Sequence, residues 1–160
     1  MSSKGSATGP MALQGGDNSM ARRSVRPLIG KNHEVGHEVI DTDHQAIAEC
    51  WKLAVNCEPI QLPFYVARLK KLMRSHFDRE AALMKRAGGE LCECHRQQHN
   101  ILLDLCERAN ALSSRNWRKA QSLLRYQLPK LVREHINCMD QIAALFINVN
   151  TSTVGEHTRA

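Results

Sequence analysis

The chain has 160 residues, with 22 Lys and Arg against 16 Asp and Glu, which gives a formal charge of +6 at neutral pH. Hydrophobic residues make up 42% of the sequence but aromatic residues only 4%, and this scarcity of aromatic and β-branched runs argues against a β-sandwich. No apolar stretch is long enough to cross a bilayer and no Sec-type export signal is found, so we expect a cytoplasmic protein without a membrane partner.

The N-terminal residues 1–30 are rich in Gly, Ser and Ala and predict a disordered extension. We expect the folded domain to cover residues 31–150 and a flexible tail to cover residues 151–160. Part of the basic excess falls in this N-terminal arm, and no recognised nucleic-acid-binding motif accompanies it. We therefore expect a solvated basic surface and no nucleic-acid partner. The oligomeric state is not specified by the sequence, although a monomer is compatible with it.

Helical periodicity begins near residue 41, where Asp41 or Thr42 is the expected N-cap of a first helix that ends at Cys57-Glu58-Pro59. A second helix is predicted from about residue 63 to Arg86 and is terminated by Gly88-Gly89. The apolar stripe of the first helix contains His44, Ile47, Ala48, Trp51 and Val55. The apolar stripe of the second helix contains Leu69, Met73, His76, Phe77, Glu80, Leu83 and Met84.

A third helix is predicted over about residues 90–112, and a fourth helical region over about residues 115–148, kinked or divided at Pro129. The apolar stripe of the third helix contains Leu91, His95, His99, Leu102, Cys106 and Ala109. The apolar stripe of the fourth helical region contains Leu131, Val132, His135, Met139, Ile142 and Leu145. Four amphipathic helices joined by short loops predict an all-α, antiparallel up-down-up-down four-helix bundle.

Polar side chains interrupt the core-facing stripes of all four helices. They are five histidines and two carboxylates: His44, His76, Glu80, His95, His99, His135 and Asp140. Burying an imidazole without a partner costs about 1–3 kcal/mol, so five of them in one core need a common solution. Two metal ions provide that solution, since imidazole and carboxylate suit iron and bundles build such sites between facing helices.

Helical spacing places two pairs of these residues in position to bind one ion together. His76 and Glu80 are four residues apart, as are His95 and His99, so each pair projects from one helix face. His135 and Asp140 are five residues apart, which is about 140° around an α-helix. We therefore expect that this last pair cannot chelate one ion as the others can. The two residues could still approach two adjacent ions with Asp140 as a bridge, and the alternative is that Asp140 is a simple carboxylate at the edge of the bundle.

Two other motifs contain metal-binding residue types. His33–His37 matches the His-Glu-x-x-His pattern of zinc proteases, but it contains Gly36 and follows the N-terminal arm. Ile40 and Asp43 stand where the extended protease motif would have Gly and His, so we expect this segment only to lead into the bundle. Cys92-x-Cys94-His95 has no standard zinc spacing, and we expect no separate zinc site there.

The six cysteines are Cys50, Cys57, Cys92, Cys94, Cys106 and Cys138. In a small secreted domain such a set would suggest disulfides. Because no export signal is found, we expect reduced thiols that are largely buried in helices.

The ordered motifs of this chain resemble those of the bacterial hemerythrin family over about residues 35–149. They are Val35-Gly36, Ile40-Asp41-x-x-His44, His76-Phe77-x-x-Glu80-x-x-x-Met84, His95-x-x-x-His99 and His135-x-x-x-x-Asp140. The resemblance departs at three places. Relatives usually have a Trp near Lys31-Asn32 and many have one near Leu131, while Ala81 replaces the second carboxylate of a usual Glu-Glu pair.

The resemblance implies a non-haem centre of two iron ions joined by a solvent-derived oxo or hydroxo bridge. His95, His99 and His135 would bind one iron, and His44 and His76 the other, which would keep an open position for O2. Glu80 and Asp140 would bridge the two ions. Phe77 and Val132 would line the O2 pocket, although ordinary core packing also accounts for them.

Two functions are compatible with such a centre. The first is reversible O2 binding, by a carrier, store or sensor rather than an enzyme. The second is a di-iron redox enzyme or stress protein on the same scaffold, such as a peroxidase, a nitric-oxide-handling protein or an iron-repair protein. A purely structural bundle is a third reading, and it would leave the seven polar residues without a role.

Overall fold

The computed structural model describes residues 26–30 and 33–156. All the secondary structure in these residues is helical and none of it is strand, which confirms the all-α prediction. In chain order the elements are α1 (Glu38–Asn56), the 3₁₀ turn η2 (Pro59–Gln61), α2 (Leu62–Arg86), α3 (Glu93–Ser113), α4 (Trp117–Ser122), the π-helical turn η3 (Leu123–Gln127), α5 (Leu128–His135), the π-helical turn η4 (Ile136–Asp140) and α6 (Gln141–Glu156).

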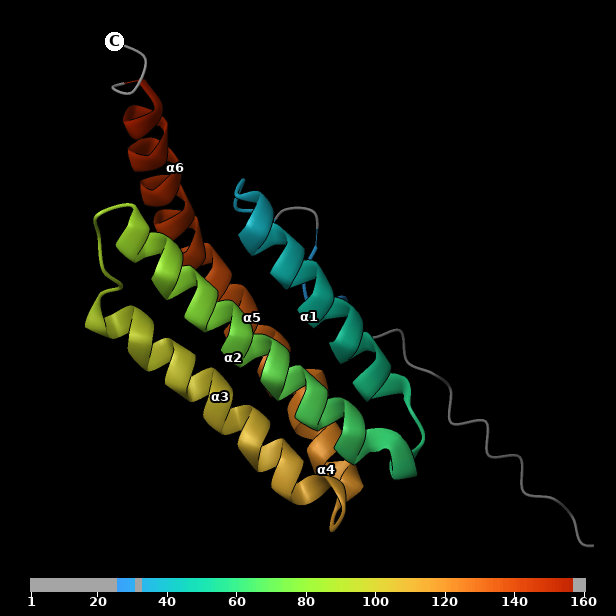
Figure 1. Cartoon of the computed structure of the whole chain (residues 1–160). Coiled ribbons are helices and arrows are strands. Elements are labelled where there is room, and N and C mark those ends of the chain that lie inside the picture. Colours follow the sequence, from blue (N-terminus) through green and yellow to red (C-terminus); the bar gives the residue numbers. More distant parts are fainter. Residues whose placement is uncertain (1–25, 31–32, 157–160) are drawn as a thin grey trace, which may run out of the picture.

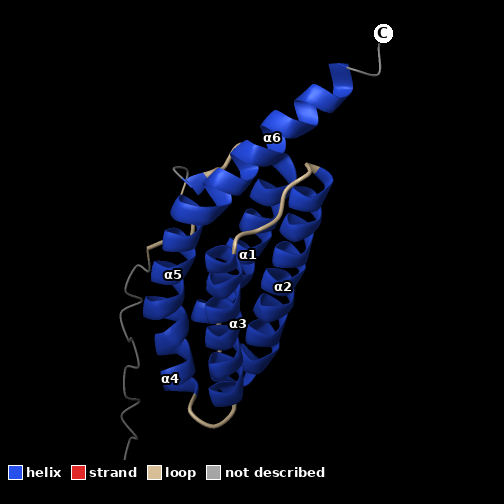
Figure 2. Cartoon of the chain, turned by 90° about the vertical axis from the view of Figure 1, so that its left-hand side faces the viewer, coloured by secondary structure: helices blue, strands red, loops and turns tan. Residues whose placement is uncertain are grey.

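The helices pack side by side as a bundle (Figures 1 and 2). α1 contacts α2, α2 contacts α3, and α3 contacts α4 and α5, so each helix lies beside its neighbour in the chain. In Figure 1, α1, α2, α3 and the continuous rod from α4 to α6 run alternately in opposite directions. None of the helices within the described ranges combines the length and the apolar character that a membrane span needs.

The folded domain includes residues that we expected to lie in the N-terminal extension. Leu28 is only 1% exposed and belongs to the main apolar core, and Ile29 packs against that core. Burying a leucine side chain contributes about 1.5–3 kcal/mol, so this short segment adds to the stability of the bundle. Residues 1–25 of the predicted extension lie outside the described residues.

The beginning of α1 differs from the prediction. The helix starts at Glu38 with His37 as its N-cap, rather than near residue 41. Asp41, in the first turn, accepts hydrogen bonds from the backbone N–H groups of Val35, Gly36 and His37 at 2.8, 3.0 and 3.1 Å. Gly36 has φ of 75°, a conformation that favours glycine, and it lets the lead-in fold back onto this carboxylate.

The same segment shows why the zinc-protease motif does not form. His33 and His37 precede α1 and lie on either side of the turn at Gly36. They therefore do not share a helix face, which is what binding one ion in that motif requires. As expected, the segment leads into the bundle.

The fourth helical rod is continuous and contains two π-helical turns instead of a break at Pro129. Pro129 lies directly after η3 and has no N–H, so it removes one backbone hydrogen bond from the continuous rod without ending it. The widened turn at η3 leaves the carbonyl of Leu124 to accept a hydrogen bond from the Trp51 indole at 2.7 Å. This bond ties the rod to α1.

The second π-helical turn changes which face of the rod points inward. We expected Ile142 and Leu145 on the inner face, but they are 68% and 64% exposed. Ala143, Ala144 and Ile147 are buried instead. A π turn contains one residue more than an α-helical turn, so every residue after it is displaced around the helix relative to the α-helical prediction.

Candidate metal centre

The seven side chains that we singled out come together in the middle of the bundle. His44 is supplied by α1, His76 and Glu80 by α2, His95 and His99 by α3, His135 by α5 and Asp140 by η4. All seven are buried, and none is more than 7% exposed. Residues from four separate helical segments therefore meet in one water-poor place, as the spacing of the sequence predicted.

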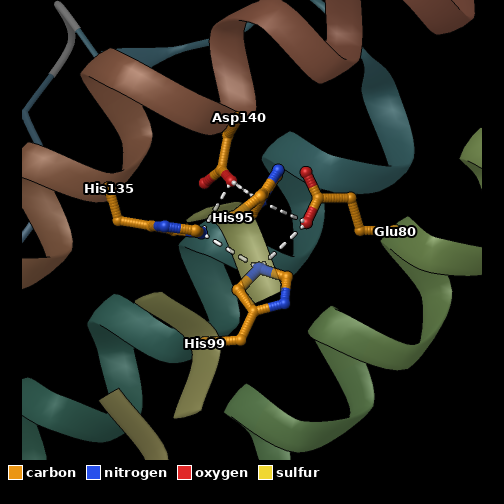
Figure 3. Close-up of side chains that lie close together, drawn as sticks. All are labelled: Glu80, His95, His99, His135 and Asp140. Carbon is orange, nitrogen blue, oxygen red and sulfur yellow. Dashed lines mark hydrogen bonds and ion pairs between the residues drawn. The ribbon is translucent and has the colours of Figure 1, made fainter. Parts of the chain in front are cut away.

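Five of these residues form one group, which we call the five-residue cluster: Glu80, His95, His99, His135 and Asp140 (Figure 3). Glu80 Oε2 lies 3.2 Å from both His95 Nε2 and His99 Nε2. Asp140 Oδ1 lies 2.9 Å from His135 Nε2 and 3.5 Å from His95 Nε2. One ligand atom from each residue lies within 4.8 Å of all the others, so the group could hold a metal ion.

A second group, the three-residue cluster, contains His44, His76 and again Asp140. Its imidazole rings meet edge to face with their centroids 4.8 Å apart, and Asp140 Oδ2 lies 3.1 Å from His44 Nε2. Asp140 thus turns one oxygen to each cluster. Glu80 falls only in the five-residue cluster, although we expected it to bridge as well.

Many atoms of these clusters are buried without a hydrogen-bond partner. They include both carboxylate oxygens of Glu80, both ring nitrogens of His76, His95 Nε2 and Asp140 Oδ1. Some of them approach one another within ion-pair distance, yet their directions do not suit hydrogen bonds. Leaving one such atom unpaired costs about 1–3 kcal/mol, and a cation between them would satisfy several at once. The residues therefore fit a metal centre.

The π-helical turn η4 overturns our expectation for His135 and Asp140. In an α-helix, residues five apart point in different directions, and we expected this pair to be unable to serve one ion. In η4 the repeat is five residues, so both side chains point to the same side of the rod. Their ligand atoms are 2.9 Å apart and belong to the same cluster.

Burial and pairing act in opposite directions on the charges of the clusters. Burial alone would raise the pKa of Glu80 and Asp140, but their contacts with histidines outweigh it and lower the pKa of both. Burial opposes a charge on His95, yet the two carboxylates raise its pKa to about 9. Burial dominates at His99 and lowers its pKa. The clusters thus keep two carboxylates ionised, which favours a positive charge between them.

Two residues that we did not single out support the histidines from outside. Asp43 Oδ2 lies 3.5 Å from His76 Nδ1, and the Arg79 guanidinium donates to the same carboxylate at 2.7 Å. Burial opposes ionisation of Asp43, but His76 and Arg79 lower its pKa to about 2. Gln98 Oε1 lies 3.0 Å from His135 Nδ1. Such partners fix the ring orientation of metal-binding histidines.

A small cavity lies against the three-residue cluster. Its volume, measured as the space open to the centre of a water-sized sphere, is about 20 Å³, which is enough for one small molecule. Phe77 and Val132 line it together with His44, His76 and Asp140, and its other walls are mainly aliphatic. Phe77 also stacks on His99 with ring centroids 3.8 Å apart. The two residues that we expected at an O2 pocket therefore do line a cavity beside the clusters.

The cysteines depart from the expectation of reduced, buried thiols. Cys50 and Cys106 are buried as expected, and burial raises the pKa of Cys106 to about 12. Cys138 is exposed. Cys92 and Cys94 are exposed too and are joined by a disulfide at the start of α3. The expectation of reduced thiols is therefore wrong for this pair, whose cysteines are two residues apart in the chain.

Comparison with known proteins adds no assignment to this geometry. No protein-family model, curated protein or solved structure matches the chain. The interpretation of the clusters therefore depends on their own residues, distances and burial.

Proposed function

We propose that the chain binds O2 reversibly at a non-haem centre of two iron ions held by the five-residue and three-residue clusters. The observation that supports this most strongly is the set of seven buried ligand residues with several unpaired nitrogen and oxygen atoms. Imidazole and carboxylate together suit iron, and zinc or manganese would accept the same donors. The resemblance to bacterial hemerythrins, which have the same ligand types in the same order, is what favours iron.

The two clusters offer different numbers of donors, and this difference supports binding of a small ligand at one ion. The five-residue cluster brings five side chains to one place, whereas the three-residue cluster brings His44, His76 and the shared Asp140. An ion in the three-residue cluster would be left with free positions, and the small cavity lies on that side. When bound, a pair of ferrous ions supplies the electrons that reversible O2 binding requires.

The surrounding residues have roles of their own in this proposal. Asp140 would hold the two ions together, and Glu80 Oε1, which has no hydrogen-bond partner, would be free to reach the second ion. Asp43 and Gln98 would orient His76 and His135. The largely apolar walls of the cavity, including Phe77 and Val132, would exclude water and so limit proton transfer to the bound ligand.

A second function, redox catalysis at the same centre, is favoured by a surface groove between α2 and α3. The groove has a volume of about 510 Å³ and is lined by His99 and Phe77 as well as by charged residues such as Arg74, Asp78 and Lys85. A substrate larger than O2 could therefore reach the outer edge of one ligand histidine. An O2 carrier has no need of such a groove.

Iron content and optical titration distinguish these functions. The purified chain is loaded with ferrous iron, freed of excess metal, reduced without air, exposed to O2 and then returned to an O2-free atmosphere. Two irons per chain and an absorbance that rises with O2 and falls again when it is removed support reversible binding. Two irons that convert irreversibly to the ferric form favour redox catalysis, and a chain that binds no iron contradicts both proposals.

A matched control uses a histidine outside the clusters. His37→Ala removes one histidine without touching the seven ligand residues, and it should bind two irons like the parent chain. His95→Ala removes a histidine of the five-residue cluster and should not. Equal iron content in the two variants would contradict the assignment of the clusters as the iron site.

A further inference from the structure

The disulfide between Cys92 and Cys94 has no part in the proposed centre and calls for an explanation of its own. Both residues are exposed, and they lie where the chain leaves the turn after α2 and enters α3 (Figure 1). Their Cα atoms are 5.4 Å apart, within the range that a disulfide requires. The residue that follows directly is His95, a member of the five-residue cluster.

This disulfide cannot act as an effective structural crosslink. A disulfide stabilises a fold mainly by closing a loop in the unfolded chain, and its contribution grows with the length of that loop. Here the sulfurs are two residues apart in sequence, so the bond joins the N-cap of α3 to that helix's own first turn. It ties no second element to the first. Its chemical reactivity is therefore a better explanation for the pair than stability.

The surroundings of Cys92 favour a reactive sulfur. Cys92 is the N-cap of α3, and its Sγ accepts a hydrogen bond from the backbone N–H of His95 at 3.3 Å. Exposure lets dissolved reagents reach both sulfurs. The buried Cys106, whose pKa is raised to about 12, shows the opposite environment.

We propose that Cys92 and Cys94 form a reversible dithiol–disulfide site that hydrogen peroxide oxidises and small thiols reduce. The Cys92 sulfur attacks one peroxide oxygen, the O–O bond breaks, and the leaving hydroxide takes the thiol proton to become water, which makes Cys92 a sulfenic acid. The Cys94 thiol then attacks that sulfur and releases a second water. Two thiols and one peroxide give one disulfide and two waters. Two molecules of a small thiol reverse the oxidation by thiol–disulfide exchange and leave as their own disulfide.

The spacing of the pair suits this chemistry. A sulfenic acid at Cys92 would have its resolving thiol only two residues away on the same helical turn, so capture would precede further oxidation to sulfinic acid. The lone exposed Cys138 offers a contrast within the same chain, because no second cysteine is paired with it. The proposal does not depend on which metal, if any, the two clusters bind.

Mass spectrometry of one tryptic peptide tests the proposal directly. Cleavage after Arg86 and Arg96 releases residues 87–96, which contain Cys92 and Cys94 and no other cysteine. The reduced full chain is treated with one equivalent of hydrogen peroxide, quenched with N-ethylmaleimide at increasing times and digested. We expect the peptide to lose both labels and become about 2 Da lighter than the dithiol form, whereas the peptide of Cys138, which has no partner cysteine, gains oxygen or stays labelled. Reduced glutathione should restore the labels.

Two variants assign the roles of the two sulfurs. Cys94→Ser should accumulate sulfenic or sulfinic acid at Cys92, because the resolving thiol is missing. Cys92→Ser retains a hydroxyl that can cap α3, and its remaining Cys94 should oxidise slowly. Cys138→Ser is the matched control and should leave the rate of disulfide formation unchanged. Circular dichroism of each variant verifies that the bundle is folded.

Three results would overturn the proposal. One is a peptide that keeps both labels as long as Cys138 does. Another is a disulfide that excess glutathione cannot open. The third is oxidation that occurs only when the clusters are loaded with iron, because the peptide would then report chemistry of the centre. For this reason the experiment is run on iron-loaded and on chelator-treated protein, and equal rates in the two samples support an independent site.

Discussion

The five-residue and three-residue clusters share Asp140 but differ in how completely they surround an ion. The five-residue cluster draws its donors from α2, α3, α5 and η4, and its histidine nitrogens and carboxylate oxygens lie mostly within 3.5 Å of one another. The three-residue cluster has fewer donors and faces the small cavity. Under our proposal, one bundle therefore contains a crowded site that would hold an ion firmly and an open site that would bind a further ligand.

Removing the shared residue should have the largest effect, because it damages both clusters at once. We expect Asp140→Ala to lower the iron content from two ions per chain to less than one, measured by elemental analysis after gel filtration. Asp104→Ala removes an exposed aspartate of α3 and serves as the control. If Asp140→Ala retained two ions, the bridging role of this carboxylate would be refuted.

Removing the second carboxylate should be nearly as damaging if Glu80 reaches both ions. We expect Glu80→Ala to lose stable loading of two irons, because Glu80 supplies a buried negative charge and neither of its oxygens has a hydrogen-bond partner. Iron content and the optical response to O2 measure the effect. A variant that retains one ion would place Glu80 in the five-residue or the three-residue cluster alone, and retention of two ions with O2 binding would contradict the bridging assignment.

Substituting one histidine of each cluster should separate the two sites. We expect His44→Ala to retain about one iron per chain in the five-residue cluster and to lose the optical response to O2. The matching substitution, His99→Ala, leaves four donors in its cluster and should weaken the more firmly held ion instead. Equal losses in the two variants would show that the clusters do not load independently, and a preserved O2 response in His44→Ala would place the open position elsewhere.

Residues behind the histidines should have smaller effects, each confined to one cluster. Asp43→Asn weakens the charged contact with His76, and we expect the metal affinity of the three-residue cluster to fall about 10- to 100-fold. Gln98→Leu removes the acceptor of His135 and should affect the five-residue cluster in the same range. Competition with a coloured chelator measures both affinities. A crossed pattern, in which each variant weakens the other cluster, would reverse our assignment.

The smallest effect should come from filling the cavity. Val132→Ile adds one methylene group beside the three-residue cluster and reduces the space for a ligand in the cavity. We expect unchanged iron content and an O2 affinity lowered by up to about tenfold. Val66→Ile adds the same group to the apolar core of α2, and it should leave O2 binding untouched. An unchanged O2 affinity in Val132→Ile would separate the cavity from ligand binding.

The sequence predicted the helices and the seven polar residues of the clusters because both follow from helical periodicity. Apolar residues spaced three or four apart mark a buried stripe wherever the backbone is α-helical. The backbone of α1, α2 and α3 is α-helical, so the rule holds for these helices. The same rule failed at the fourth rod, where it placed Ile142 and Leu145 inside. The residue types of η4 do not predict a π turn, and the one available signal was the spacing of His135 and Asp140, which equals the five-residue step of its hydrogen bonding.

Other features were missed because they depend on contacts between distant residues. Asp43 meets His76 across two helices, and Gln98 meets His135 across another two, so sequence spacing holds no signal for either pair. Leu28 and Ile29 are only two neighbouring apolar residues in this segment, too few to show any periodicity. The Cys92–Cys94 disulfide could have been considered from spacing alone, but the inferred compartment argued against it.

The extra residue in η4 also affects how the length of the fourth rod can vary. Deleting one residue within 136–139 would convert the π turn into an ordinary α-helical turn, and His135 and Asp140 would then be four residues apart. The two side chains would still share a face, as His95 and His99 do on α3. A deletion of one residue in α2 or α3 would instead rotate half of a helix away from the core. At η4 the number of residues in the chain can therefore change while the direction of the ligands is kept.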